Sequence, residues 1–239
     1  MWILSNKIRV NESGLFEDFR DCHCHLLPGV DDGVKGTKET LRILSFWETL
    51  GVKEVYLTPH IMEDIPNTPI ELTTKYEILK TQYKGNIQLF LSAENMMDGL
   101  FVKRLEAGDL LTLGSNGKRL LVETSYYVAP MNMDGIIYRM KEDGYEPILA
   151  HPERYHYMNQ HDYKQWKQQG VLFQLDVSAL VGAYGSNAQK KAEWLLNHEM
   201  YDYVGSDTHG LGQIEYLLNS LISKKTVKKV KRLAEEQVL

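Results

Sequence analysis

The segment DCHCHLLPGVDDG, residues 21–33, is dense with side chains that bind metal ions. It holds two histidines, two cysteines and three aspartates. Because side chains alternate between the two faces of a β-strand, we expect Asp21, His23 and His25 on one face and both cysteines on the other. An H-x-H pair alone is weak evidence for a metal site, since paired histidines also pack or form hydrogen bonds in protein cores.

Further His, Asp and Glu residues lie where other predicted strands end. Short apolar runs rich in β-branched and aromatic residues predict strands at 54–58, 87–94, 119–123, 147–151, 172–177 and 201–207. The residues at or just after the strand ends include His60, Glu94, Glu123, His151, Asp207 and His209. The carboxyl ends of parallel strands lie at one edge of a sheet, so these side chains are expected to meet the histidine pair. The general polarity of loops explains one or two such residues, but not a whole set of His, Asp and Glu.

Helical patterns alternate with these strands. Helices are predicted at 37–51, with Thr37 as its cap and Gly51 as its stop, and at 131–145 and 187–200. Strand followed by helix throughout predicts an α/β fold with a mostly parallel sheet covered by helices, closed or open.

The tail, residues 223–239, is predicted to form an amphipathic terminal helix. Val227, Val230 and Leu233 share one face of it, so packing on the body of the protein is favoured over a membrane or partner helix.

The bulk composition bounds the class of protein. The 239 residues suffice for one large domain, and no repeat or linker divides them. The formal net charge of −5 disfavours nucleic acid as a partner. Only two cysteines occur, at i and i+2 of a predicted strand, and this spacing does not suit a disulfide-stabilised fold. The N-terminus lacks the apolar core of a signal peptide, and no stretch suits a transmembrane helix, so we expect a soluble, cytoplasmic protein without stable membrane insertion.

The ligand types indicate catalytic rather than structural metal. Histidines and carboxylates without thiolates suit Mn²⁺, Fe²⁺ or Zn²⁺ in a catalytic site. With Asp31 or Asp32 included, about nine ligands are available, which indicates a cluster of two or three ions able to hold a phosphoryl group and activate water. The other histidines lie outside strand ends and are expected at the surface or in caps: His156, His161 and His198.

Four ordered motifs, DCHCHLLPGVDDG, TPH, HPERY and GSDTH, resemble the polymerase and histidinol phosphatase (PHP) superfamily of trinuclear metal phosphoesterases. Within it they are similar to the bacterial manganese-dependent tyrosine-protein phosphatases found with capsule and exopolysaccharide genes. The resemblance runs from about residue 18 to 210 and implies a distorted (β/α)7 TIM-like barrel, with the metals at the carboxyl rim of the strands. We expect a single domain over 1–239, with an N-terminal extension at 1–17 and a C-terminal helix at 223–239.

The resemblance also implies how the ligands are shared among two or three Mn²⁺ ions, with Fe, Zn or Co as other candidates. The first site joins the histidine pair to a glutamate and an aspartate: His23, His25, Glu94 and Asp207. The second shares Glu94 as a bridge and adds two residues: Glu123 and His151. The third takes three others: Asp32, His60 and His209, with Asp32 preferred to Asp31 by family spacing alone.

Two residues are implied to act on the substrate. Arg154 aligns with the family arginine that binds phosphate, and a fixed guanidinium fits bidentate recognition better than a surface salt bridge. His209 is the candidate to supply a proton to the leaving group. The family often has another arginine soon after the SDTH motif, but this chain reads GLGQIEYL, which puts a second arginine in doubt. No C-x₅-R signature follows either cysteine, so a thiol mechanism is not supported and both are expected to be buried.

The function implied by the resemblance is hydrolysis of phosphotyrosine on a protein, the tail of a bacterial tyrosine kinase that controls capsule and exopolysaccharide synthesis. Hydroxide activated by metal is expected to attack phosphorus opposite the phenolate. The main alternative is a histidinol-phosphate phosphatase or other small-molecule phosphoesterase. A DNA 3′-exonuclease, an amidohydrolase and a non-catalytic, metal-stabilised phosphopeptide-binding domain rank lower. The oligomeric state is left open.

Overall fold

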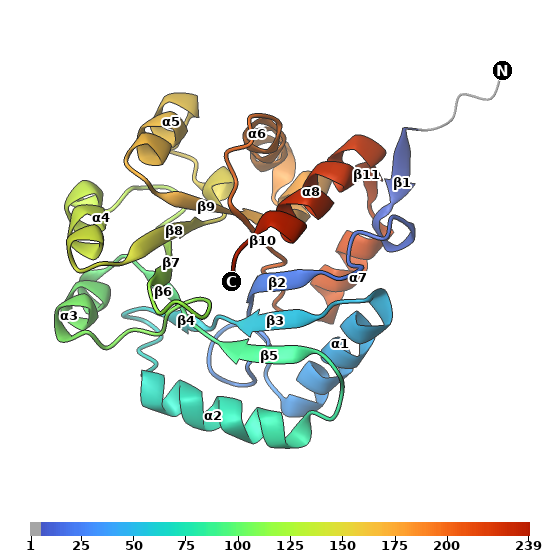
Figure 1. Cartoon of the computed structure of the whole chain (residues 1–239), viewed down its shortest axis with the longest axis horizontal. Coiled ribbons are helices and arrows are strands. Elements are labelled where there is room, and N and C mark those ends of the chain that lie inside the picture. The colour runs from blue at the N-terminus through green and yellow to red at the C-terminus, as the bar shows by residue number, and fades with distance from the viewer. Residues whose placement is uncertain (1–5) are drawn as a thin grey trace.

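A computed structural model describes residues 6–239, so the first five residues of the predicted N-terminal extension lie outside the described residues. Parallel strands occupy the centre of the molecule and helices surround them (Figure 1). One sheet has the order β2-β3-β5, and a second has the order β10-β9-β8-β7-β6-β4. Pairing is parallel throughout both sheets. The prediction of an α/β fold with a parallel sheet is therefore confirmed.

The strands of these two sheets are short. Their bounds are β2 (Arg20–Cys24), β3 (Glu54–Leu57), β4 (His60–Ile61), β5 (Gln88–Leu91), β6 (Glu94–Met96), β7 (Arg119–Glu123), β8 (Glu146–Ala150), β9 (Leu172–Asp176) and β10 (Tyr203–Gly205). An antiparallel pair, β1 (Lys7–Arg9) and β11 (Leu221–Ser223), lies apart from them.

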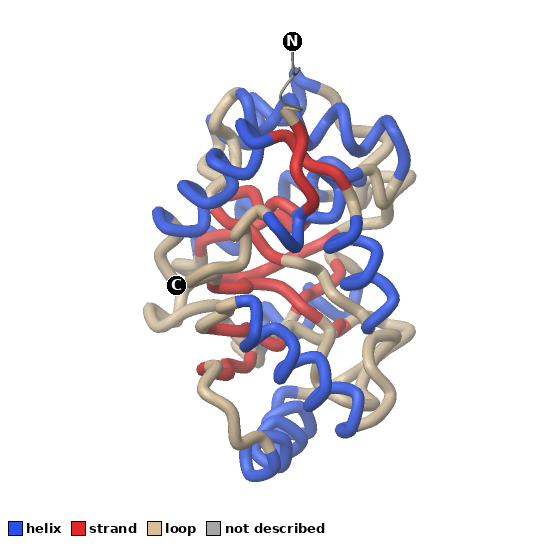
Figure 2. Tube along the Cα trace, turned by 90° about the vertical axis from the view of Figure 1, so that its right-hand side faces the viewer, coloured by secondary structure: helices blue, strands red, loops and turns tan. Residues whose placement is uncertain are grey.

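Helices follow most of the strands and cover the sheets from outside (Figure 2). Their bounds are α1 (Thr37–Leu50), α2 (Pro69–Gln82), α3 (Gly99–Ala107), α4 (Met133–Glu142), α5 (Gln160–Gln168), α6 (Gly185–Asn197), α7 (Leu211–Asn219) and α8 (Lys224–Glu236). Three short 3-10 turns complete the order: η1 (Val10–Glu12), η2 (Pro152–Arg154) and η3 (Val177–Val181). Among residues 6–239, no helix combines the length and apolar character needed to cross a membrane.

The predicted ends of the first helix are half right. Gly51 stops α1 with a φ of 96°, a left-handed conformation that glycine adopts without a Cβ penalty. The cap at the other end is Gly36, and Thr37 is the first helical residue, with no side-chain hydrogen bond capping the helix. The expectation that Thr37 caps α1 is therefore wrong by one position.

The run predicted as one strand at 87–94 is divided. β5 ends at Leu91 and pairs with β3, whereas β6 begins at Glu94 and pairs with β4. The neighbouring segment is interrupted at the same level, between β3 and β4, where Pro59 has no N–H to donate to a strand partner. Backbone bonds still cross the break, because the Glu94 N–H donates to the Pro59 carbonyl at 3.1 Å. Both strands thus bend together, and His60 and Glu94 begin their strands opposite each other.

The edge strands β2 and β10 are joined at both ends. At the carboxyl end, Asp207 N–H donates to the His23 carbonyl at 2.8 Å and His25 N–H donates to the Thr208 carbonyl at 2.9 Å. At the other end the buried Gln237 amide donates to the Arg20 carbonyl at 2.6 Å. Its oxygen accepts from the backbone N–H of Val204 in β10. The last residues of the chain therefore bridge the two strands.

Cys22 and Cys24 are free and fully buried, as predicted, but they do not share one environment. Cys24 packs in the large hydrophobic core with Leu57 and Ile61. Cys22 packs in a smaller cluster with residues such as Leu121 of β7. The pairing of β2 with β3 shifts register between Asp21 and Cys24, and this irregularity breaks the strict alternation that placed both thiols on one face.

Both termini of the described chain pack on the body. Residues of the expected N-terminal extension contribute to the core, with Val10, Leu15 and Phe16 buried and β1 paired to β11. Helix α8 buries Val227 and Val230, as predicted for a packed amphipathic helix. Within the same helix Ala234 is buried, while Leu233 is only partly covered.

Candidate metal centre

The predicted ligands gather at the carboxyl ends of the parallel strands. Three overlapping groups each bring one ligand atom per residue within 4.8 Å of the others. The groups are His23, His25, Glu94 and Asp207; His60, Glu94 and Glu123; and His25, Asp32, His60 and His209. His151 lies beside them, with Nε2 at 2.9 Å from Glu94 Oε1. The residues selected because they lie at predicted strand ends are therefore close together in the structure.

The first group is completely enclosed. His23 Nε2 lies 3.2 Å from Glu94 Oε2 and 3.3 Å from Asp207 Oδ1. His25 Nε2 lies 3.3 Å and 3.2 Å from the same two oxygens. Among the described residues, Glu94 Oε2 and Asp207 Oδ1 are buried atoms without a hydrogen-bond partner. Burying an unpaired carboxylate oxygen is costly, so two such oxygens facing two imidazole nitrogens fit a bound cation.

The second group places Glu94 between two histidines. His60 Nδ1 lies 3.1 Å from Glu94 Oε2 and 3.0 Å from Glu123 Oε1. The resemblance implied His151, not His60, as the histidine of this site; His151 Nε2 lies 2.9 Å from the other oxygen, Glu94 Oε1, and 3.9 Å from Glu123 Oε2. Glu94 Oε2 faces His60 as well as the histidine pair of the first group, while Oε1 faces His151, so the carboxylate lies between the two groups, as expected of a bridging ligand.

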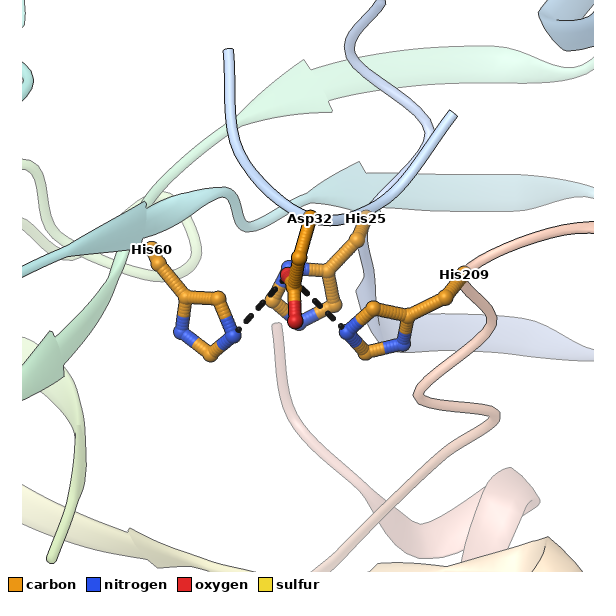
Figure 3. Close-up of side chains that lie close together, drawn as sticks. All are labelled: His25, Asp32, His60 and His209. Atoms are coloured by element: carbon orange, nitrogen blue, oxygen red, sulfur yellow. Dashed lines mark ion pairs between the residues drawn. The ribbon is translucent and has the colours of Figure 1, made fainter. Parts of the chain in front are cut away.

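The third group is the outermost (Figure 3). Asp32 Oδ1 lies 3.5 Å from His60 Nε2 and 3.4 Å from His209 Nε2, so the carboxylate sits between the two rings. The side chain of Asp32 is 63% exposed, whereas His25 beneath it is fully buried. The group therefore opens the candidate centre to solvent on one side.

Asp31 orients two members of the centre instead of joining a group. Its carboxylate accepts a hydrogen bond from His25 Nδ1 at 2.8 Å and from the His60 backbone N–H at 3.0 Å. The first bond places the His25 proton on Nδ1 and leaves Nε2 free to face Glu94 and Asp207. Asp31 is thus the supporting aspartate of the loop, and Asp32 is the one that faces the ligand group.

Replacing Asp31 with asparagine is expected to lower metal affinity by about 10–100-fold, the usual cost of losing a partner that orients a ligating histidine. The amide keeps the volume but weakens the acceptor at His25 Nδ1. Isothermal titration of the metal-free protein with Mn²⁺ measures the change. Asp64→Asn, at an exposed position, is the matched control. Equal affinities for the two variants would contradict the orienting role.

Gln174 supports two further histidines of the centre, His23 and His151, and was missed in the sequence. Its Oε1 accepts a hydrogen bond from His23 Nδ1 at 3.0 Å and from the His151 backbone N–H at 3.3 Å. It lies inside β9 and not at its end, so no strand-end signal marked it. Asp21 has a further supporting role, since its carboxylate accepts from both the backbone and the hydroxyl of Ser206.

The charges of the centre favour protonated His23 and His25 when no metal is bound. Burial lowers the pKa of His23, but the charges of Glu94 and Asp207 outweigh it and raise the pKa to about 9. The pKa of His25 is likewise raised, against burial, by hydrogen bonds to Asp207 and Asp31. A metal ion binds the neutral imidazole, so metal binding must displace these protons.

Two residues of the centre have left-handed backbones. His151 has a φ of 34° and Asp207 has a φ of 48°. Non-glycine residues in this region carry strain, which surrounding structure must hold in place and which concentrates at functional sites. His151 directly follows β8, and Asp207 lies two residues after the end of β10, so both left-handed residues occur where a parallel strand has just ended.

Arg154 lies at the edge of the centre. Its NH1 group donates a hydrogen bond to Asp207 Oδ2, and its NH2 group donates one to the Tyr126 hydroxyl at 2.6 Å. The guanidinium is held between two rings, with its carbon 4.5 Å from the centroid of Tyr126 and 4.2 Å from that of Tyr184. Such stacking suits the planar guanidinium and fixes its orientation.

Other contacts of this edge were also missed in the sequence. Asp176 ends β9 with its Oδ2 at 3.8 Å from Arg154 NH1, and burial raises its pKa to about 6. The strand predicted at 172–177 ends one residue later than β9, so Asp176 was not recognised as a strand-end carboxylate. Tyr126 and Tyr184 lie in loops, where neither periodicity nor spacing marked them.

Where a second arginine was in doubt, the structure has Gln213. Its Oε1 accepts from the His209 backbone N–H at 2.8 Å, and its amide donates to the Asp207 carbonyl at 2.9 Å and to the Tyr184 hydroxyl at 3.1 Å. This side chain therefore stabilises the loop that carries the last two predicted ligands, Asp207 and His209.

The three histidines outside the centre are exposed, as predicted: His156, His161 and His198.

Comparisons with known proteins agree with this geometry. A family model described as capsular polysaccharide synthesis, CpsB/CapC, matches residues 19–237. CapC of Staphylococcus aureus is 26% identical over 223 residues, which cover 87% of this chain and 84% of that protein. The tyrosine-protein phosphatase YwqE of Bacillus subtilis is 25% identical over 197 residues, covering 80% of this chain and 77% of that one.

A solved structure shares the fold. It is one of the crystal structures described as YwqE from Bacillus subtilis and CpsB from Streptococcus pneumoniae, metal-dependent tyrosine phosphatases. The TM-score is 0.72 at 21% sequence identity, and the match covers 92% of this chain and 95% of the other.

Proposed function

Because this chain belongs to the CpsB/CapC family of capsular polysaccharide synthesis, we propose that it is a metal-dependent phosphatase that hydrolyses phosphotyrosine in proteins. Relatives that carry the name tyrosine-protein phosphatase include YwqE of Bacillus subtilis and CpsB of Streptococcus agalactiae. The observation that carries the proposal is the set of three overlapping ligand groups, two of which share Glu94, with buried carboxylate oxygens that lack hydrogen-bond partners among the described residues.

We assign the metal ligands as the resemblance implies them. The proposed first site is His23, His25, Glu94 and Asp207; the second is Glu94, Glu123 and His151; the third is Asp32, His60 and His209. His60 faces both the second and the third group, so its ring has the position to serve either. When bound, divalent cations supply positive charge for the phosphate and lower the pKa of water to make it a nucleophile near neutral pH. Manganese is proposed from the resemblance, with iron, zinc and cobalt as alternatives, since such ligands accept several metals.

The residues of the chain itself would bind and orient the phosphate. Arg154 has five N–H donors, of which those to Asp207 and Tyr126 use two, so donors remain for phosphate oxygens. Its guanidinium lies close to the rings of Tyr126 and Tyr184, and these contacts reduce the entropy lost on binding. A phenolate leaving group has a pKa near 10, so strong proton donation is less necessary than for an alkyl phosphate.

The geometry favours His209 as a ligand over a proton donor. Its Nδ1 lies 2.9 Å from the Asp207 carbonyl oxygen, to which it can only donate. In the neutral ring this bond places the proton on Nδ1 and leaves Nε2, the nitrogen that faces Asp32, available to a metal ion. This tautomer is the one a metal ligand requires.

We also propose that the two sheets form one distorted seven-stranded barrel of the PHP type. β3 and β4 are separated by two residues, as are β5 and β6, so each pair counts as one bent strand. The bonds between His23, His25 and the segment after β10 would close the ring. On this count each strand delivers at least one residue to the rim.

For the biological setting, we propose a cytoplasmic enzyme that acts on the tail of a bacterial tyrosine kinase controlling capsule or exopolysaccharide synthesis. The family description supports the capsule context. The acidic chain, with a net charge of −5, is consistent with a protein substrate and not with nucleic acid.

The test is turnover by protein purified without chelator, stripped of metal and then reconstituted separately with Mn²⁺, Fe²⁺, Co²⁺ and Zn²⁺. We expect hydrolysis of a phosphotyrosine peptide that depends on metal and exceeds the turnover of histidinol phosphate. Full activity of the metal-free protein would contradict the metal requirement. Preference for histidinol phosphate would identify a small-molecule phosphatase, and bound metal with peptide affinity but no turnover would identify a binding domain.

A further inference from the structure

Exposed apolar side chains cluster on one loop beside the candidate metal centre. The loop at 124–132 connects β7, which ends with Glu123, to α4. The exposed fraction is 71% for Tyr127 and 69% for Val128, and Met131 is fully exposed. We call these three residues the apolar rim. Apolar side chains that cluster in water next to a site are a common mark of a binding surface.

The loop is held in place from behind. The Tyr126 carbonyl accepts a hydrogen bond from the His156 backbone N–H at 2.7 Å. The ring of Tyr127 stacks on the ring of His156, with centroids 5.0 Å apart and planes 6° from parallel. Tyr127, the first residue of the rim, is therefore held in a fixed position, which lowers the entropy cost of binding a partner there.

The rim is continuous with the residues proposed to bind phosphate. Tyr126, next to Tyr127, accepts a hydrogen bond from Arg154, and its ring centroid is 5.8 Å from that of His151. A cleft of about 250 Å³ runs between this loop and α6, and its lining includes Tyr127, Arg154 and Asn187. A peptide whose phosphotyrosine reached Arg154 through this cleft would pass Tyr127, and Val128 is the next residue of the same exposed loop.

We propose that the apolar rim binds apolar residues adjacent to the phosphotyrosine in a polypeptide substrate, an inference that rests on the proposed function. A free phosphomonoester has no group to place there, whereas a peptide has side chains on both sides of its phosphorylated residue. The loop contains no lysine or arginine, so it lacks the charge that would attract an anionic membrane. Its chemistry instead matches aliphatic or aromatic side chains.

The experiment compares three substrates: p-nitrophenyl phosphate, a phosphotyrosine peptide with leucines flanking the phosphorylated residue, and the same peptide with serines there. The test variant combines Tyr127→Ser, Val128→Ser and Met131→Ser. We expect kcat/KM on the leucine peptide to fall about tenfold through KM, as for the loss of a few apolar interface contacts. Turnover of p-nitrophenyl phosphate should be unchanged.

The control combines Ile70→Ser, Ile78→Ser and Leu221→Ser, which are apolar residues on other elements with exposed fractions of 79%, 51% and 56%. It should leave all three substrates unaffected. An equal loss on every substrate, or no loss on the leucine peptide, would overturn the inference. If the wild-type protein with metal hydrolyses none of the substrates, the proposed function is wrong. In that case, equilibrium binding of a leucine peptide that carries a non-hydrolysable phosphonate tests the role of the rim separately. Equal affinity of the wild type and the test variant would contradict that role.

Discussion

Asp207→Asn is expected to lower the phosphatase activity of the metal-loaded protein by about 10³-fold. Asp207 Oδ1 lies 3.3 Å from His23 Nε2 and 3.2 Å from His25 Nε2, at the proposed first metal site, while Oδ2 accepts from Arg154. One carboxylate thus connects the metal ligands to the proposed phosphate-binding arginine. Asparagine keeps the shape but removes the charge that both partners require. Steady-state kinetics on p-nitrophenyl phosphate with saturating Mn²⁺ measure the loss.

The chain offers a close control for this substitution. Asp18 also has a left-handed backbone, with a φ of 55°, but its side chain is 85% exposed and contacts only Lys53 among the ion pairs of the described residues. Asn tolerates this conformation well, so neither variant should unfold. Asp18→Asn should keep full activity. Circular dichroism and thermal melting establish that both variants are folded, and a folded Asp207→Asn protein with normal turnover would disprove the role of Asp207.

Arg154→Lys is expected to lower kcat/KM on aryl phosphates by about 10²-fold, although the charge is kept. Lysine cannot bond Asp207 and Tyr126 at fixed angles or lie flat between the rings of Tyr126 and Tyr184. The loss should therefore reflect misplacement of the positive charge, not its absence. Arg154→Met, which removes the charge as well, should lose more.

Competition by inorganic phosphate separates this role from a structural one. If Arg154 binds the phosphoryl group, Arg154→Lys should weaken inhibition by phosphate along with turnover, while Mn²⁺ affinity stays within a few-fold of wild type. Arg139→Lys, at an exposed residue paired only with Asp143 among the described side chains, is the matched control. A variant that lost Mn²⁺ affinity but kept its phosphate affinity would show that Arg154 serves only to support Asp207.

The sequence alone was sufficient to select the residues of the centre. A parallel sheet delivers the residues at its strand ends to one rim, so His23, Glu123 and His151 could be grouped without knowing any distance. Ligand chemistry then distinguished them from ordinary loop residues, because His, Asp and Glu recur at these positions. The same local rules predicted β7 residue for residue and the glycine that ends α1.

Local pattern was less reliable where the chain bends. The apolar run at 87–94 reads as one strand, yet it divides before Glu94 because its neighbour also bends, at Pro59. The two thiols likewise fall in different clusters, since the register of β2 shifts within the strand. A residue's own neighbours in sequence do not determine such irregularities, because they depend on the strand alongside.

The supporting contacts were decided only by the tertiary structure. Asp31 and Asp32 are adjacent and chemically identical. The spacing typical of the family favoured Asp32 as the ligand but gave no role to Asp31. The fold turns Asp31 onto His25 Nδ1 and Asp32 outward between His60 and His209. Gln174 and Tyr184 bear no pattern at all and acquire their roles from the residues opposite them. Residue type and strand position determine which atoms can bind a metal, but the direction of each side chain depends on long-range packing, which no local sequence pattern encodes.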